Sequence, residues 1–372
     1  MSRLRVLYVV PQGEIGGAER FLDSIVGYHD AASVVPSVLA MRDGPWLDQL
    51  RARGIEANVL PHARLRELPR LTPVLYRFLR REHIDVVHSW YGWCHSLVTP
   101  AAAMAGCKRV WFHHGPIGRR RWQGWQHLIP ADLLLLNSYF LLSRLRQTLY
   151  SAKRTEVVHY AIDADRIRPD PDARQRFRRA WRISDDTVAI GIVGFIDSWK
   201  GQDLFLRAGA QVLETRRNVR LFVVGGPRGG PAAHRCEAVQ RELHDFVDAT
   251  GIGDSVAFTG HVDVLDGALD GLDVVVHAST EPEPFGMVIL EAMAKQTPVI
   301  ASGEGGPCEI IDDGRSGILF EPRATQSLVS AMLEASDDRS VRERLGTCAR
   351  SEVAKRFTPE KAAARLEALY AG

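Results

Sequence analysis

Two glutamates, Glu283 and Glu291, carry the strongest chemical signal in this 372-residue sequence. They stand eight residues apart, and a Pro-Phe-Gly turn directly after Glu283 leads into an apolar stretch of helical character. Carboxylates in such positions accept hydrogen bonds from the paired hydroxyls of a ribose or a hexose. The amides at the start of the helix, on Phe285, Gly286 and Met287, are free to bind sugar oxygens or phosphate. The segment therefore predicts a site for a sugar that carries phosphate.

Two glycine-containing turns predict phosphate binding. Gly16 and Gly17 follow a strand and open a helix, where the backbone can approach a ligand closely and the helix start attracts anions. Lys200 stands between the strand-ending Gly194 and a helix, a position that suits a diphosphate. Structural glycines and an exposed loop lysine are the alternatives. The sequence lacks the G-x-G-x-x-G fingerprint, which argues against an oxidoreductase.

A histidine pair, His113 and His114, follows another strand of the first half. In an α/β domain, a histidine at the carboxyl end of a strand points into a cleft, where it can bond a hydroxyl or exchange a proton. Two surface histidines are one alternative, and a metal site is another. No third ligand stands nearby at a useful spacing, so no metal is expected.

The elements that must position these residues are short apolar runs that alternate with amphipathic stretches. This pattern is typical of parallel sheets with helices on both faces. The sequence therefore predicts an α/β fold with two Rossmann-like, doubly wound domains that face a deep cleft. The domains are expected at residues 1–165 and 166–357, with the linker in the Asp- and Pro-rich stretch 161–171 and a C-terminal helix, 358–372, crossing back onto the first domain. The expected strands are 4–10, 34–41, 57–60, 86–89, 109–112, 133–137 and 156–159, then 188–193, 221–224, 256–259, 274–278, 298–301 and 317–320; helices are expected at 18–28 and 71–82, among others.

Composition and charge narrow the class of protein. With 45% hydrophobic and 25% charged residues, the chain reads as a soluble globular protein, and no apolar run is long enough for a membrane-spanning helix. The five cysteines are scattered without paired spacing, which predicts a reducing, cytoplasmic compartment. Residues 1–165 hold 21 Lys and Arg against 14 Asp and Glu, although the whole chain has a net charge of only +2. This excess predicts an anionic partner on the first domain, unless it reflects a merely uneven surface.

Taken together, the motifs resemble the retaining glycosyltransferases of family 4, which have the GT-B fold. The Glu-x7-Glu segment in its Pro-Phe-Gly setting is the most specific part, and the other pieces follow in the family's order over nearly the whole chain. They are Gly16–Arg20, His114-Gly115, Asn137-Ser138, Lys200-Gly201, Val223–Pro227, Phe258–His261, Glu283–Gly286, Glu291–Ala294, Pro298–Ala301 and Gly305-Gly306.

The resemblance implies roles for the residues that match. Gly17 would lie against the donor phosphates, with Gly16 shaping the turn, and His114 would touch the transferred sugar. The two domains would close on the donor. The family keeps the anomeric configuration and needs no metal. No cofactor is implied beyond a UDP- or GDP-linked sugar as co-substrate.

In the second domain, the resemblance implies that Lys200 neutralises the diphosphate as it leaves. Glu283 would hold the hydroxyls of the sugar, and Glu291 those of the ribose. The expected catalytic residues are thus His114, Lys200 and Glu283. The further donor-binding candidates are Gly194, Gly225, Gly260, His261, Phe285, Gly286 and Met287.

The sequence departs from the family's pattern at several positions. Phe195 stands where a phosphate-binding arginine is usual, and Arg228 or Arg20 could compensate for the lost charge. Gln296 occupies a position where glycine is common, and Tyr160-Ala161 replaces the usual Asn-Gly. The Phe195 change keeps open the alternative of a catalytically weak or inactive nucleotide-sugar-binding protein or partner subunit. An epimerase or phosphorylase is a further alternative.

Basic and aromatic residues of the first domain predict where the acceptor binds. One stretch, 64–81, interleaves six arginines with Leu, Tyr and Phe. Such patterns suit an anionic membrane surface, although a solvated helix face is the alternative. We therefore expect a glycan or lipid-linked acceptor of cell-envelope, lipopolysaccharide or exopolysaccharide synthesis, reached at the inner face of a membrane, and no nucleic acid. A second stretch with this pattern contains Arg119, Arg120, Arg121, Trp122 and Trp125.

Overall fold

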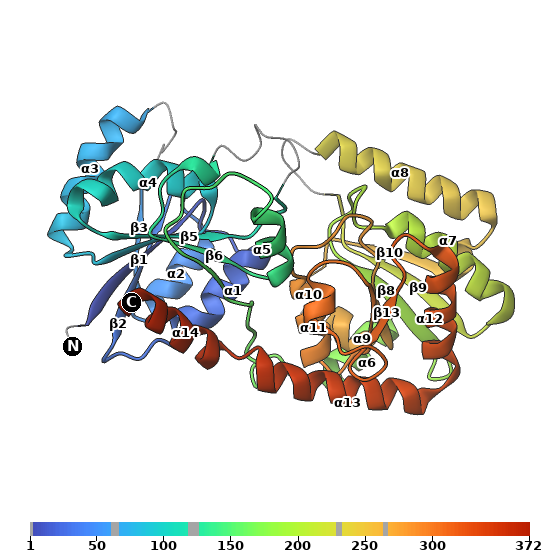
Figure 1. Cartoon of the computed structure of the whole chain (residues 1–372). Coiled ribbons are helices and arrows are strands. Elements are labelled where there is room, and N and C mark those ends of the chain that lie inside the picture. The colour runs from blue at the N-terminus through green and yellow to red at the C-terminus, as the bar shows by residue number, and fades with distance from the viewer. Residues whose placement is uncertain (1–2, 61–66, 118–125, 228–232, 263–266) are drawn as a thin grey trace. The chain divides into compact units, whose positions relative to one another are not determined.

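The computed structural model describes residues 3–60, 67–117, 126–227, 233–262 and 267–372 (Figure 1). The chain divides into two compact units, which we call unit 1 (Met1–Ala161 with Pro359–Gly372) and unit 2 (Ile162–Thr358). The division falls a few residues before the expected boundary at 165. The reason is visible at Arg350, whose guanidinium donates to the carbonyls of Ala164 and Ile167 and so ties this stretch to unit 2.

Unit 1 is built on a seven-stranded parallel sheet with the order β3-β2-β1-β4-β5-β6-β7. Several strands contain apolar runs without polar alternation, because helices cover both faces of the sheet and bury most of the side chains. Four consecutive leucines, all buried, make up β6, for example. The strands are β1 (Leu4–Val10), β2 (Val34–Ala40), β3 (Glu56–Val59), β4 (Val86–Ser89), β5 (Lys108–His113), β6 (Leu133–Leu136) and β7 (Thr155–Val157).

The helices of unit 1 include one from the far end of the chain, α14, which lies beside α1 (Figure 1). The OH of Tyr370 on α14 lies 3.0 Å from the OH of Tyr8 and 2.6 Å from Nδ1 of His88, both on central strands. Lys108 Nζ donates to the carbonyls of Leu369 and Tyr370, so a cation stabilises the carboxyl end of the helix. The helices are α1 (Gly17–Val26), α2 (Pro45–Ala52), α3 (Leu68–Arg81), α4 (Gly92–Ala105), α5 (Tyr139–Leu145) and α14 (Pro359–Ala371).

Replacing Tyr370 with phenylalanine should lower the free energy of unfolding by about 1–3 kcal/mol, the cost of leaving a buried polar group unsatisfied. Nε2 of His88 has no hydrogen-bond partner among the described residues, so the variant would leave both nitrogens of this buried ring without one. Denaturant unfolding measures the loss. Tyr150→Phe, at a partly exposed site, is the control and should change little; equal stability of the two variants would contradict the prediction.

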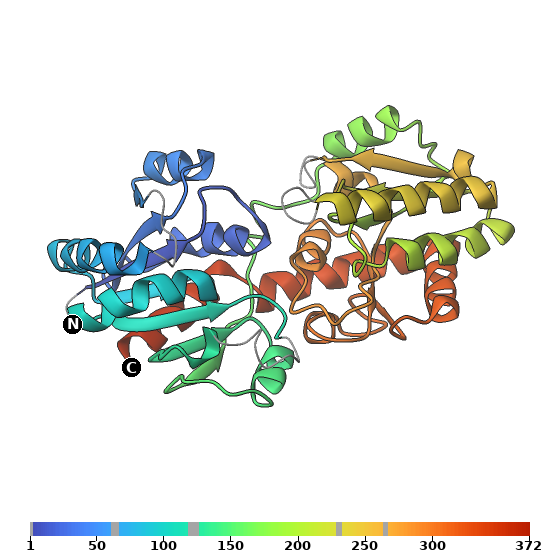
Figure 2. The same cartoon turned by 90° about the horizontal axis from the view of Figure 1, so that it is seen from above.

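Unit 2 has a six-stranded parallel sheet with the order β10-β9-β8-β11-β12-β13. Its core gathers apolar side chains from the central strands and from α7 and α12. Helix α8 runs alongside α7, as the view from above shows (Figure 2). The strands are β8 (Val188–Val193), β9 (Val219–Val224), β10 (Val256–Gly260), β11 (Val274–His277), β12 (Val299–Ser302) and β13 (Ile318–Phe320). The helices are α6 (Pro171–Ala180), α7 (Gln202–Thr215), α8 (Ala233–Thr250), α9 (Leu269–Gly271), α10 (Met287–Ala294), α11 (Pro307–Ile310), α12 (Thr325–Asp337) and α13 (Arg339–Arg356), with a short 3₁₀ helix, η4 (Gly253–Ser255).

Two parallel-sheet α/β units are thus present, and the predicted fold class is confirmed. The predicted strand ranges agree with the observed ones to within two residues at every strand end. Helix α3 begins three residues before the expected 71, because Pro69 is accommodated in its first turn. None of the described helices is both long and apolar enough to cross a membrane.

Candidate functional site

The carboxyl ends of β8, β9 and β10 bring three of the predicted glycines together. The Gly194 amide donates to the Val224 carbonyl at 2.9 Å, and the Gly225 amide donates to the Gly260 carbonyl at 3.0 Å. All three glycines have positive φ angles, of 145°, 126° and 67°. A Cβ on Gly225 would lie 2.1 Å from the carbonyl oxygen of Gly194. Only glycine therefore fits there, and this edge of the sheet stays open at its backbone.

Lys200 and Glu283 meet at the same edge, although 83 residues separate them in the chain. Lys200 follows β8 and Glu283 follows β11, which pair as neighbouring parallel strands. The Lys200 Nζ lies 2.9 Å from the Glu283 Oε2. Burial alone would raise the pKa of Glu283, but the charge of Lys200 and hydrogen bonds from His277 and Lys200 outweigh it and hold this pKa well below its usual range. Glu283 is thus ionised, and the site pairs one cation with one anion.

The loop that carries Lys200 is fixed by its surroundings. The Lys200 amide donates to the Asp197 carbonyl, and Nζ lies 3.9 Å from the ring centroid of Trp199. Gly201, which precedes α7, has a φ of +74°. A Cβ at Gly201 would lie 1.9 Å from the carbonyl oxygen of Ala278. The loop therefore packs directly against the start of the segment that leads to Glu283.

Gly201→Ala should lower the free energy of unfolding by about 2 kcal/mol or more, since it combines a strained φ with a clash against backbone. It should also weaken ligand binding through the adjacent Lys200. The matched control is Gly251→Ala, because Gly251 has a similar φ of +67° but open space around its Cβ position. Thermal unfolding of both variants measures the difference. If Gly251→Ala costs as much as Gly201→Ala, the close approach to Ala278 is not what fixes the loop.

A pair of glycines on the neighbouring turn positions Glu283. The Gly306 amide donates to the Glu283 carbonyl at 2.8 Å, and Gly305 has a φ of +81°. A Cβ on Gly305 would lie 2.5 Å from that same carbonyl oxygen. Gly286, with a φ of +113°, then turns the chain into α10. The Glu283 loop is therefore held from β12 on one side and from α10 on the other.

The other predicted residues of the Glu-x7-Glu segment lie in different environments. Glu291 is buried on α10. The side chain of Phe285 is 1% exposed and packs edge-on against Phe357, so only its main chain can reach a ligand. Met287, the first residue of α10, is half-buried.

Phe195 stands in place of the expected arginine, two residues beyond the end of β8. Its ring is 49% exposed and stacks on His261 at a centroid distance of 6.3 Å. Arg228, one of the two residues that could compensate, lies outside the described residues, and the other, Arg20, is on α1 of unit 1. Arg235 on α8 forms an ion pair with Asp197 of this loop at 3.3 Å.

In unit 1, the predicted residues lie at the carboxyl ends of β1 and β5. Gly16 and Gly17 are exposed at the start of α1, and the Gly16 amide already donates to Glu19 Oε2 at 3.2 Å. His114 bonds the OH of Tyr160 through Nδ1 at 2.8 Å, whereas its Nε2 has no hydrogen-bond partner among the described residues. Burial holds the pKa of His114 well below its ordinary value, so the imidazole is neutral near pH 7.

The predicted acceptor-binding stretch lies outside the described residues: Arg119, Arg120, Arg121, Trp122 and Trp125 all fall in the gap 118–125. Of the other basic stretch, the structure describes 67–81. Within the described ranges, no group of three or more His, Cys, Asp or Glu side chains could hold a metal ion. The exposed arginines of α3 are Arg70, Arg77, Arg80 and Arg81.

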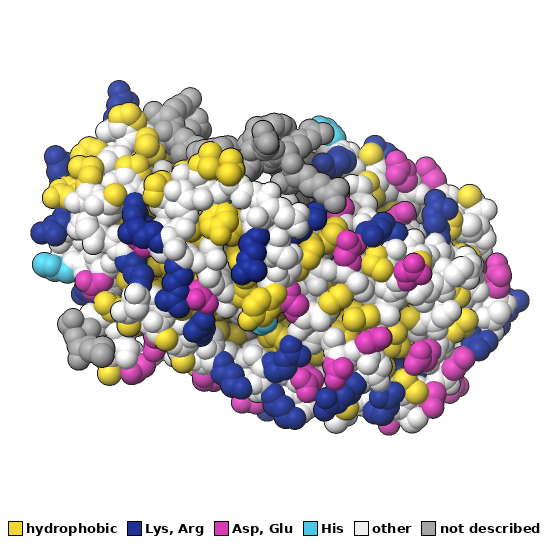
Figure 3. Space-filling model, in the orientation of Figure 1, with side chains coloured by type: hydrophobic (Ala, Val, Ile, Leu, Met, Phe, Trp, Pro, Cys, Tyr) yellow, Lys and Arg dark blue, Asp and Glu magenta, His cyan; other side chains and the backbone are white. Residues whose placement is uncertain are grey.

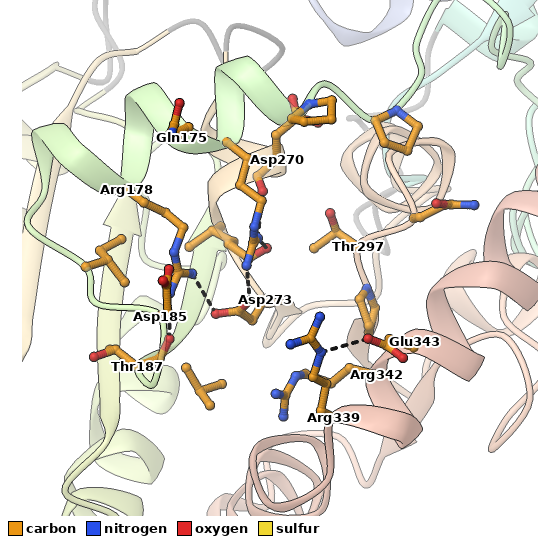
Figure 4. A pocket seen from close by; sticks show the side chains of 18 of the residues that line it. Gln175, Arg178, Asp185, Thr187, Asp270, Asp273, Thr297, Arg339, Arg342 and Glu343 are labelled. Carbon is orange, nitrogen blue, oxygen red and sulfur yellow. Dashed lines mark hydrogen bonds and ion pairs between the residues drawn. The ribbon is translucent and has the colours of Figure 1, made fainter.

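A cavity of about 1070 Å³ lies at the opposite edge of the unit 2 sheet (Figure 4). It is lined where strands begin, for example by Val188 and Pro298, and not where they end. Its charged side chains largely pair with one another: Arg178 bonds Asp273 at 2.9 Å, and Lys295 bonds Asp270 at 2.6 Å. The cavity is therefore remote from Lys200 and Glu283, and it offers no excess of charge to a ligand.

Sequence reasoning gave no role to His277 and Ser279, which the structure places against Glu283. His277 Nε2 lies 3.3 Å from the Glu283 Oε2, and Ser279 Oγ lies 3.3 Å from the same atom. A signal was present, because His277 ends a buried strand and Ser279 follows it, just before the Glu283 loop. This signal was weak by itself, because the fold of the loop decides which side chains contact the Glu283 carboxylate.

The chain is similar to known proteins in both sequence and fold. The family described as Glycosyl transferases group 1 matches residues 173–352, and the one described as Glycosyltransferase Family 4 matches residues 15–166. A D-inositol 3-phosphate glycosyltransferase of Geodermatophilus obscurus is 31% identical over 347 residues, which cover 85% of this chain and 74% of the relative. A GDP-mannose-dependent alpha-(1-6)-phosphatidylinositol monomannoside mannosyltransferase of Mycobacterium tuberculosis is 29% identical over 342 residues, covering 86% and 84%. The crystal structure of Anabaena HepE in complex with UDP-glucose is similar in fold, with a TM-score of 0.85 at 23% identity and full coverage of both chains.

Proposed function

Because this chain belongs to the group 1 and family 4 glycosyltransferases, we propose that it moves a hexose from a UDP- or GDP-linked donor to an anionic acceptor, with retention of the anomeric configuration and without a metal. The acceptor is a glycan or lipid-linked molecule of the cell envelope. The observation that carries the proposal is the Lys200–Glu283 pair at the open, glycine-lined edge of the unit 2 sheet.

Lys200 and Glu283 bind different parts of the donor. A lysine ammonium has three donor hydrogens, so Lys200 can keep its bond to Glu283 while it bonds a phosphate oxygen. As the bond between the sugar and the diphosphate breaks, negative charge grows on the phosphate, and a fixed cation lowers the barrier. The Glu283 carboxylate accepts hydrogen bonds from the sugar hydroxyls. Glu291, buried on α10, accepts those of the ribose.

The proton of the acceptor goes to the departing phosphate. The acceptor oxygen forms its bond to the anomeric carbon on the face from which the phosphate leaves, and a phosphate oxygen takes the hydroxyl proton. His114 bonds a sugar hydroxyl through Nε2, which is unpartnered among the described residues. Its lowered pKa supports this role, because a neutral imidazole adds no positive charge beside the developing oxocarbenium ion.

An anionic acceptor is supported by the charge of unit 1 and by the relatives. The arginines of α3 are exposed, and on the face shown in Figure 3 most acidic side chains lie over unit 2. The two relatives named above act, by their names, on an inositol phosphate and on a phosphatidylinositol mannoside. We propose an acceptor that carries phosphate, reached at the cytoplasmic face of the membrane, where each basic residue near anionic lipid contributes about 1 kcal/mol.

The test is product formation from radiolabelled UDP-glucose and GDP-mannose, offered separately with a soluble inositol phosphate and with vesicles that contain phosphatidylinositol. Labelled product in the soluble arm identifies a free acceptor, and product only with vesicles identifies a lipid-linked one. Glu283→Gln is the control and should abolish both. Tight donor binding without product in either arm would overturn the proposal in favour of a non-catalytic nucleotide-sugar-binding protein, which the exposed Phe195 ring would then explain.

A further inference from the structure

The hydrogen bonds of the Glu283 carboxylate all fall on one of its two oxygens. Lys200 Nζ, at 2.9 Å, and Ser279 Oγ and His277 Nε2, each at 3.3 Å, surround Oε2. In the part of the chain that the structure describes, Oε1 has no hydrogen-bond partner and is not among the fully buried polar atoms. The side chain is therefore anchored through one oxygen and presents the other to a ligand.

The hydrogen-bonding role of His277 follows from the surroundings of its two nitrogens. Nε2 lies 3.3 Å from Glu283 Oε2 and 3.4 Å from Ser279 Oγ, and the Ser279 hydroxyl donates its own hydrogen to Glu283. Because a carboxylate only accepts hydrogen bonds, Nε2 must carry a hydrogen to bond either oxygen. Nδ1 is buried and has no partner among the described residues. A hydrogen on Nδ1 would be a buried donor without an acceptor, which is costly. The ring therefore acts on Glu283 through Nε2, as a hydrogen-bond donor.

The two tasks of Lys200 make such a donor necessary. When a diphosphate binds, Lys200 keeps its bond to Glu283 but shares its charge with phosphate oxygens, so its attraction for Glu283 weakens. Ser279 and His277 leave the sheet on the same strand end, β11, and are 3% and 4% exposed, so they cannot turn away. We propose that His277, with Ser279, is a positioning residue that keeps Glu283 in place when Lys200 engages the diphosphate, so that Oε1 binds a hydroxyl of the donor sugar. This inference rests on the proposed function.

The experiment compares binding of nucleoside diphosphates and of nucleotide sugars to His277→Leu and His277→Gln by calorimetry. Glutamine places an amide nitrogen close to where Nε2 lies, whereas leucine removes the donor and keeps an apolar side chain. His277→Leu should bind UDP-glucose or GDP-mannose about 10- to 100-fold more weakly, the effect of one hydrogen bond to a charged group. Its affinity for UDP or GDP should be unchanged, because these ligands lack the sugar. His277→Gln should recover most of the loss.

A double variant tests whether His277 acts through Glu283. If it does, His277→Leu combined with Glu283→Gln should bind the nucleotide sugar no more weakly than Glu283→Gln alone. Equal weakening of diphosphate and nucleotide-sugar binding by His277→Leu, or full additivity in the double variant, would overturn the inference. Failure of the unmodified protein to bind any nucleotide sugar would instead overturn the proposed function on which it rests.

Discussion

Replacing Lys200 with methionine is expected to lower kcat/KM for sugar transfer by about 100- to 1,000-fold, the range found when one preorganised donor to a developing anion is removed. Methionine keeps the length and the apolar body of the side chain but removes the charge. The diphosphate then leaves without its cation, and the Glu283 carboxylate keeps only the bonds from His277 and Ser279. Steady-state transfer from a labelled donor, corrected for the folded fraction, measures the effect.

Lys295→Met is the matched control for this experiment. Lys295 forms an ion pair with Asp270 at 2.6 Å, with both side chains almost fully buried, at the opposite edge of the same sheet. Breaking a buried pair costs about 3–5 kcal/mol, so this variant should lose at least as much stability as Lys200→Met. Its kcat/KM per folded molecule should stay unchanged. If both variants lose transfer equally, the role of Lys200 is only to hold unit 2 together.

Acidification from pH 6.5 to 5.5 is expected to lower the free energy of unfolding of unit 1 by about 4 kcal/mol. Burial lowers the pKa of His88 and of His113 to about 3 and that of His95 to about 4, and it holds the pKa of His114 well below its ordinary value. The unfolded chain binds protons at these residues below its ordinary pKa of about 6.5, and the folded chain does not. The stabilisation is therefore complete above this pH and is lost as the pH falls toward the pKa values of the folded chain. Between pH 6.5 and 5.5, each histidine accounts for a loss of about 1 kcal/mol.

Denaturant unfolding at several pH values, followed by tryptophan fluorescence, measures this dependence. His95→Gln should reduce the slope by about one quarter, because it removes one of the four groups. His234→Gln serves as the control, since that side chain is fully exposed and should leave the slope unchanged. A stability that stays flat between pH 6.5 and 5.5, or a slope that only His234→Gln alters, would contradict the prediction.

The fold was predictable from the sequence because buried parallel strands have apolar sequences without polar alternation. Val188–Val193 is such a run, and the observed strand has the predicted bounds. For two departures from the family's pattern, only the structure shows what the residue does. Gln296 has a φ of +58°, in the left-handed region where glycine is unstrained, and Tyr160 supplies the hydroxyl that bonds Nδ1 of His114.

The candidate site was predictable only in part. The residue types near Glu283 and Lys200 indicated a phosphate and a sugar, but their direct contact depends on β8 and β11 being neighbours in the sheet, which no local pattern encodes. The inward orientation of the Phe285 side chain could not be predicted from the sequence either, since its partner Phe357 is 72 residues away in the chain. Which oxygen of Glu283 is anchored and which is open follows only from side-chain geometry.

The most direct test of a nucleotide-sugar site on unit 2 is a thermal-shift panel of UDP, GDP, UDP-glucose and GDP-mannose, run on the unmodified protein, Lys200→Met and Lys295→Met. A donor at 100 times its dissociation constant stabilises the folded state by about 2.7 kcal/mol. We expect a clear shift with one base, largest for its sugar-linked form, that disappears in Lys200→Met and persists in Lys295→Met. No shift with any of the four ligands, or a shift that Lys200→Met retains in full, would contradict a donor site built on Lys200 and Glu283.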